Sequence, residues 1–230
     1  MTGEPDVPQD EDKLAPVRNV LLTLLTIGTG AVDATTFLSA GHVFSSVITG
    51  NLVLLGIAIG WHGAGRPLAV GIAIVAYAGG VAVGTRQGRA GSHHDSLWPR
   101  AVTVTLAVEL AVLAGFSLSW EFLHAESGGW QVFLLALLAT AMGLQSSAVR
   151  RLGKVSTTYL TSTLTGLVEG LVSGEGRAGA LRSLVLLASV TAGAAVGTLA
   201  FHLYPALTPV VLAVPLAVVV TVATVRASGV

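Results

Sequence analysis

The chain has 230 residues, of which 53% are hydrophobic and 10% are charged, and its mean hydropathy of +0.78 is higher than that of water-soluble domains. Twelve Lys and Arg residues balance twelve Asp and Glu residues, which argues against a strongly basic surface for nucleic acid. The lack of cysteine excludes disulfides and thiolate metal sites. The composition therefore predicts a protein whose solvent is the lipid bilayer.

The first seventeen residues are acidic and rich in proline, and they include Asp10, Glu11 and Asp12. Such a stretch buries too little apolar surface to fold, so residues 1–17 are expected to form a disordered cytoplasmic tail. A cleaved signal peptide would begin with basic residues instead. Residues 18–230 are expected to form a single polytopic membrane domain whose first helix is retained as an anchor.

Eight apolar segments of low charge follow the tail. A helix that crosses the bilayer needs about 20 residues, and the second and sixth segments fall at the lower limit of that range. These two segments also contain the polar triplets Thr49-Gly50-Asn51 and Thr161-Ser162-Thr163. The segments run approximately from Arg18 to Ser39, Phe44 to Gly60, Pro67 to Thr85, Arg100 to Ser119, Trp130 to Val149, Ser156 to Ser173, Leu181 to His202 and Thr208 to Val225.

The distribution of basic residues favours six crossings over eight, because Lys and Arg collect on the cytoplasmic side of a membrane. Eight crossings would divide the twelve basic residues equally between the two sides. If the second and sixth segments enter and leave by the same face, every basic residue except Arg66 lies on the side of the N-terminus. We therefore predict six transmembrane helices plus two re-entrant or short helices, with both termini cytoplasmic; eight short crossings are the alternative.

The sequence also indicates an internal duplication. Aligning the chain with itself so that Gly41-His42-Val43 falls on Gly153-Lys154-Val155 also pairs Thr49 with Thr161 and Asp33 with Gln145. Shifting this alignment by one more residue places residues 80–85 on residues 193–198, and the two stretches are identical at five of six positions. The repeats would cover about residues 18–120 and 130–226.

Three crossings in each repeat would insert the second repeat upside down relative to the first. Inverted repeats of this kind are typical of transporters and channels, in which the site lies near the midplane where interrupted helices meet. The glycines Gly80, Gly84, Gly193 and Gly197 have the small-xxx-small spacing that allows close helix packing, and packing is their expected role.

Two motifs resemble a known family. The first is Gly30-Ala31-Val32-Asp33-Ala34 followed by Val43-Phe44 and Ile48-Thr49-Gly50-Asn51, and the second is Gly143-Leu144-Gln145-Ser146 followed by Thr157-Thr158-Tyr159-Leu160-Thr161. They resemble the YoaK-type family of bacterial inner-membrane proteins, over nearly the whole chain after the tail. The resemblance implies a multi-pass protein of the cytoplasmic membrane with no established substrate. Thr161-Ser162-Thr163 stands where the family pattern suggests Thr-Gly-Thr, so an identical bend in both motifs is not implied.

Asp33 is the clearest candidate for a functional residue, because a carboxylate within an apolar helix is costly and tends to mark a pathway, a proton relay or a paired charge. We expect it to meet Thr49 and Asn51 and to bind a polar solute with them. A purely structural role, in which Asp33 bonds to a neighbouring helix, is the alternative.

The remaining candidate binding residues are polar groups within apolar segments. Thr49, Gly50 and Asn51, with Thr161 and Thr163, are suited to an interrupted helix because hydroxyl and amide groups cap exposed N–H groups. Simple capping is the alternative. Glu109 is the carboxylate placed most deeply in an apolar segment, and Gln145 is the counterpart of Asp33 in the second repeat. Glu169 lies near a predicted segment end, where water could solvate it.

No motif for catalysis or for a cofactor is present. The sequence lacks His-Glu-x-x-His, a P-loop and Gly-x-Ser-x-Gly, and its histidines lack the spacing of metal ligands. The expected function is therefore non-enzymatic movement of a small polar solute by a transporter or channel, without a cofactor or metal. The alternative is a membrane scaffold that binds a partner. Both are compatible with a homo-oligomer, and the bilayer is the one partner that the composition itself requires.

Overall fold

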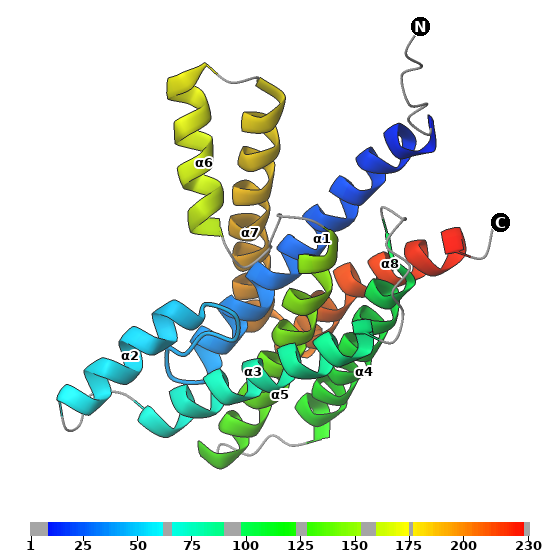
Figure 1. The fold of residues 1–230 in the computed structure, drawn as a ribbon. Helices are drawn as coiled ribbons and strands as arrows, with labels where there is room; N and C mark the ends of the chain where they lie inside the picture. The colour runs from blue at the N-terminus through cyan, green and yellow to red at the C-terminus, as the bar shows by residue number, and fades with distance from the viewer. Residues whose placement is uncertain are drawn as a thin grey trace, which may run out of the picture.

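A computed structural model describes residues 9–61, 66–89, 98–122, 128–152, 160–174 and 177–227. Within these ranges the chain forms α-helices joined by short connections, and no strand is found there (Figure 1). The helices are α1 (Gln9–Ser39), α2 (Ile48–Gly60), α3 (Pro67–Arg89), α4 (Arg100–Phe122), α5 (Gly128–Val149), α6 (Leu160–Ser173), α7 (Arg177–Leu203) and α8 (Thr208–Ala227), with the 3₁₀ turns η1 (Arg150–Leu152) and η2 (Pro205–Leu207).

Six of these helices are long and apolar enough to cross a bilayer: α1, α3, α4, α5, α7 and α8. Helix α2 has 13 residues and α6 has 14, so each is only about 20 Å long, whereas the hydrocarbon core is about 30 Å thick. The structure thus confirms the predicted class of six transmembrane helices plus two short ones.

The first helix begins within the predicted tail. Helix α1 starts at Gln9 and so includes residues 9–17 of that tail; a separate disordered tail stays a prediction. Residues 1–8 of the predicted tail lie outside the described part of the chain.

Helices α1 and α5 form the centre of the bundle. In the membrane-length part of α1, 61% of the residues are buried, and in that of α5, 67% are buried. The corresponding share in the other four long helices is 28–33%. Helix α1 packs against α7 and α8, α5 packs against α3 and α4, and α1 and α5 touch each other. The short helices lie apart, α2 beside α3 at the lower left and α6 beside α7 at the upper left of Figure 1.

Two helix crossings without space for side chains hold the bundle together. A Cβ atom added at Gly30 of α1 would collide with the carbonyl oxygen of Val190 in α7. A Cβ atom at Gly143 of α5 would collide in the same way with the carbonyl oxygen of Tyr77 in α3. Glycine permits this approach of backbones, which supplies van der Waals contact where no hydrophobic effect drives helices together.

These two crossings correspond residue by residue. The offset that places Gly80 on Gly193 also places Gly30 on Gly143, and it places their contacts Tyr77 and Val190 on each other. The helix partners also correspond when helices α1–α4 (the first half) are matched in order with α5–α8 (the second half). The pair α1–α7 then corresponds to α5–α3, α1–α8 to α5–α4, and α2–α3 to α6–α7, and all six pairs are observed. The packing is therefore repeated along the chain.

The main hydrophobic core lies among α1, α4, α5 and α8. Its fully buried members include Leu25, Leu106, Phe116, Met142 and Val219. A second cluster, the α3–α5 side cluster, packs Ala69, Val70 and Ala73 of α3 and Leu135 and Ala139 of α5 against Ala40 and Val43 from the α1–α2 connection. Large apolar side chains also cover the outer surface, as expected for helices that face lipid.

Candidate functional site

Asp33 anchors the connection between α1 and α2. Its Oδ1 accepts hydrogen bonds from the backbone N–H of Ser45 (3.0 Å), the Ser45 hydroxyl (2.7 Å) and the backbone N–H of Ser46 (2.8 Å). Its Oδ2 accepts one from the Ser46 hydroxyl (2.5 Å). Four donors surround one buried carboxyl group, which is the arrangement that makes a polar side chain tolerable in an apolar helix.

The partners of Asp33 differ from those predicted. Thr49 and Asn51 were expected to satisfy the carboxylate, but Ser45 and Ser46 do so. Thr49 is exposed. The reason is geometric: the chain turns back at Gly41 and His42, both with positive φ angles (76° and 66°), and so presents the residues before α2 to Asp33.

Asn51 closes the same connection from the other side. Its Oδ1 accepts from the backbone N–H of Phe44 (3.1 Å) and its Nδ2 donates to the carbonyl oxygen of Phe44 (2.7 Å). The predicted interruption therefore lies before Thr49-Gly50-Asn51, which form the first turn of α2. A Cβ atom added at Gly50 would lie 3.3 Å from Cγ1 of Val47, so a side chain at this position would be tightly packed but not excluded.

Gln145 connects the two halves at the centre of the bundle. Its Nε2 donates to the hydroxyl of Thr29 (2.7 Å) and to the carbonyl oxygen of Leu25 (3.4 Å), both in α1. The side chain is 2% exposed, so this α5–α1 contact is shielded from lipid and water. Thr29 precedes Asp33 by one helical turn, and the predicted counterparts Asp33 and Gln145 thus lie on helices that touch.

Glu109 is fully buried in α4. Neither of its carboxyl oxygens has a hydrogen-bond partner among the residues that the structure describes. Leu106 and Leu113, one turn away on either side, belong to the main hydrophobic core. An unpartnered carboxyl group in such surroundings carries a large desolvation cost, and a group of this kind is a candidate for function.

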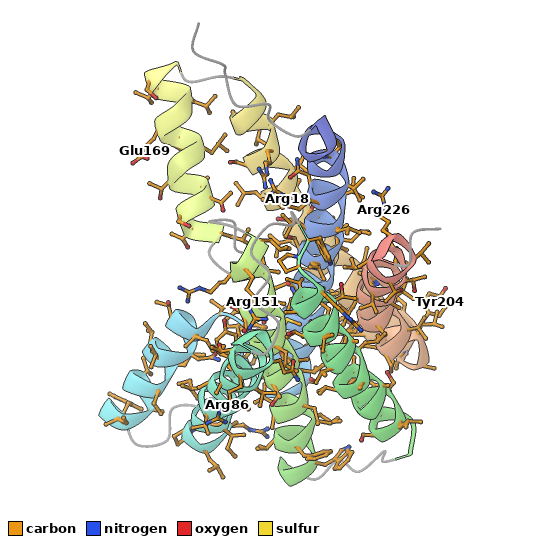
Figure 2. The ribbon with its side chains drawn as sticks, turned by 45° about the vertical axis from the view of Figure 1, so that its right-hand side comes forward. Arg18, Arg86, Arg151, Glu169, Tyr204 and Arg226 are labelled. Carbon is orange, nitrogen blue, oxygen red and sulfur yellow. The ribbon has the colours of Figure 1, made fainter. Side chains whose placement is uncertain are left out.

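The second polar triplet lies elsewhere. Thr161 and Thr163 are in the first turn of α6, and Thr161 is exposed. Because α6 packs against α7 and lies apart from α2 (Figure 1), the structure does not bring this triplet to Asp33. Glu169 of α6 is exposed and points away from the bundle (Figure 2).

The grooves described between the helices have mainly apolar walls. One, of 490 Å³, lies between the N-terminal parts of α1 and α7. Another, of 290 Å³, lies beside the α1–α7 crossing and is lined by α1, α7 and α8. Asp33, Asn51, Gln145 and Thr161 line neither of these two grooves. No cluster of three potential metal ligands occurs in the described parts of the chain.

Six apolar helices of membrane length around buried polar side chains define a multi-pass α-helical membrane protein. The chain belongs to the family described as protein of unknown function (DUF1275), whose model matches residues 21–223. It is also 36% identical over 169 residues, 68% of each chain, to the UPF0700 transmembrane protein YoaK of Bacillus subtilis (strain 168). No solved structure matches. The predicted membership of a YoaK-type family is confirmed.

Proposed function

We propose that this protein moves a small polar solute across the bacterial cytoplasmic membrane, as a transporter or channel without catalytic activity. The observation that carries the proposal is Glu109, a fully buried carboxyl group without a hydrogen-bond partner among the described residues. A group that only stabilised the fold would be expected to have donors around it, as Asp33 has. A free carboxyl group within a crossing helix can instead exchange a proton or bind a solute.

Polar side chains are also buried in the two central helices. Helix α1 buries Thr26, Thr29, Thr35 and Thr36 besides Asp33, and α5 buries Gln145, Ser146 and Ser147. The threonine hydroxyls of α1 donate to carbonyl oxygens of their own helix. They keep acceptor capacity for a solute, which supports a polar path along α1.

The repeated packing supports an architecture built from two equivalent halves. The glycine crossings α1–α7 and α3–α5 each join one half to the other, so the halves interlock through equivalent contacts. We propose that the halves are inverted relative to each other, with both termini in the cytoplasm. Inverted repeats are typical of transporters in which a central site opens to either side in turn.

A scaffold without transport is the second candidate. It is favoured by Asp33, whose four hydrogen bonds account for its presence without any solute. In that case the polar centre would only hold α1 and α5 in register, and a partner protein or a second copy of the chain would bind at the outer surface.

Flux measurements on reconstituted protein separate the two. We expect wild-type proteoliposomes to conduct protons, or to take up members of a panel of amino acids, sugars and organic acids, above the level of empty liposomes. Glu109→Gln has nearly the same volume but cannot ionise, so it should reduce that flux at least about tenfold if the carboxyl group exchanges a proton. Glu169→Gln removes the exposed carboxylate of α6 and is the matched control, which should retain wild-type flux.

Thermal unfolding of the same samples checks that both variants are folded. Flux equal to that of empty liposomes for folded wild-type protein would reject transport of these solutes and favour the scaffold. Equal flux in wild type and Glu109→Gln would remove Glu109 from the pathway.

A further inference from the structure

The groove between α1 and α7 lies at the end of the bundle where both helices begin. Its volume is 490 Å³, and its walls are apolar side chains including Val20, Leu22, Val185 and Leu186. Asn19 and Arg182 supply polar atoms at its rim. Both helices enter their membrane-length windows here, at Pro16 and Gly179. The groove therefore begins near the membrane surface and continues into the apolar layer.

Two arginines at this rim have buried nitrogen atoms without a protein partner. Nε of Arg18 and Nη2 of Arg182 are buried, and neither forms a hydrogen bond within the described chain. Arg18 directly precedes Asn19, which lines the groove together with Arg182. Oδ1 of Asn19, in the groove wall, is buried without a donor. The rim thus offers two cations and a hydrogen-bond acceptor to a group that the described chain does not supply.

The corresponding position in the first half is filled by the protein itself. The offset that places Gly80 on Gly193 pairs Leu22 with Leu135 and Ala69 with Arg182, and both Leu135 and Ala69 are members of the α3–α5 side cluster. There, Ala40 and Val43 from the α1–α2 connection complete the packing. Among the described residues, the second half has a groove at the same place, with an arginine where the first half has alanine; the counterparts of Ala40 and Val43 lie outside these residues. The apolar walls and the two arginines suit an occupant that is apolar along the groove and anionic at the rim.

We propose that this groove binds an anionic phospholipid, with its phosphate between Arg18 and Arg182 and an acyl chain along Val20, Leu22 and Val185. Basic pockets between helices at a membrane surface bind anionic headgroups in this way, and guanidinium groups suit phosphate because they donate several hydrogen bonds in one plane. A glycerol headgroup adds a hydroxyl that can donate to Asn19. A free anion would satisfy the arginines but leave the apolar walls uncovered.

Native mass spectrometry of the purified full-length protein tests the proposal. The protein is mixed in detergent with equal amounts of phosphatidylglycerol and phosphatidylcholine that carry the same acyl chains. Wild type should retain phosphatidylglycerol preferentially. The variants Arg18→Gln and Arg182→Gln should each reduce that preference about fivefold, the effect of one basic residue beside an anionic lipid. Arg226→Gln removes an exposed arginine of α8, which Figure 2 shows apart from Arg18, and should leave the preference unchanged.

Two further arms separate the headgroup from the acyl chain. Val185→Phe fills the groove without changing its charge, and it should reduce retention of phosphatidylglycerol. Inorganic phosphate at millimolar concentration should not displace the lipid. The proposal is overturned if both arginine variants retain the lipid as wild type does, if Val185→Phe has no effect, or if phosphate alone competes fully. Should an arginine variant fail to fold, the lipid preference of wild type and the Val185→Phe result decide.

Discussion

At the scale of single residues, two buried carboxyl groups show opposite environments. Asp33 has four hydrogen-bond donors within 3.0 Å, whereas Glu109 has none among the described residues. The first carboxyl group therefore contributes to the stability of the α1–α2 connection. The second reduces stability, since nothing in the described chain compensates for its removal from water. This contrast is the reason for assigning a structural role to Asp33 and a transport role to Glu109.

The structural role of Asp33 can be measured. Asp33→Asn keeps the size of the side chain but replaces one acceptor oxygen with a donor that faces the Ser46 hydroxyl. We expect a loss of about 2 kcal/mol in stability, because an oxygen that accepts a serine hydrogen bond becomes a donor and the hydrogen bond is mismatched. Thermal unfolding in detergent, followed by tryptophan fluorescence, reports the change. Thr49→Val, at an exposed position of the same region, is the control and should change stability little.

The sequence identified Asp33, Glu109, Asn51 and Gln145 correctly as buried polar residues, because a polar residue within an apolar segment is a strong local signal. It did not identify Ser45 and Ser46. They lie 12 and 13 residues after Asp33, and their contact depends on the path of a connection with two positive φ angles, which no periodic pattern encodes.

At the scale of elements, close backbone contact between helices replaces the large apolar side chains of a soluble core. Gly80 of α3 meets the carbonyl oxygen of Thr140 in α5, and Gly193 of α7 meets that of Ile27 in α1. A Cβ atom added at the adjacent residue Gly79 would have no described atom within 4 Å. Neighbouring glycines in one helix thus have different roles, and the difference follows from the face of α3 that each one occupies.

This difference predicts opposite effects of the same substitution. Gly80→Ala should lower the stability by about 2 kcal/mol or more, because the added methyl group forces α3 and α5 apart. Gly79→Ala should leave it unchanged or raise it by about 0.5 to 1 kcal/mol, since alanine has the higher helix propensity and enters open space. Melting temperatures of the two variants provide the comparison, and equal losses would contradict the crossing as described.

The boundaries of the elements were predicted more accurately than their contacts. The third helix was expected from Pro67 and begins there, and the sixth was expected to end at Ser173 and does so. Apolar runs bounded by charged residues, glycine or proline are sufficient for this. The crossing glycines Gly30 and Gly143 were missed, because an isolated glycine carries no local signal. The offset that aligns the two glycine motifs pairs these residues as well, and it could have revealed them.

At the scale of the whole molecule, the two halves make equivalent helix contacts, but the surfaces beside these contacts differ. The first half fills its α3–α5 side cluster with its own chain, and the second half leaves a groove at whose rim two arginines have buried nitrogens without a partner in the described chain. The buried carboxyl groups are likewise distributed unequally, since Asp33 and Glu109 both belong to the first half. A repeated framework with specialised halves is consistent with a site that acts on a solute while lipid seals one side.

Labelling of single cysteines tests the central claim, because the natural chain has none to remove. The claim is that two short helices fold back within the membrane and so invert the second half. Cysteines at positions 150 and 177, which flank α6, should then react with a membrane-impermeant maleimide from the same face, and one at position 60, after α2, from the opposite face. Reaction of positions 150 and 177 from opposite faces would contradict the inversion and leave a bundle of crossing helices without alternating halves.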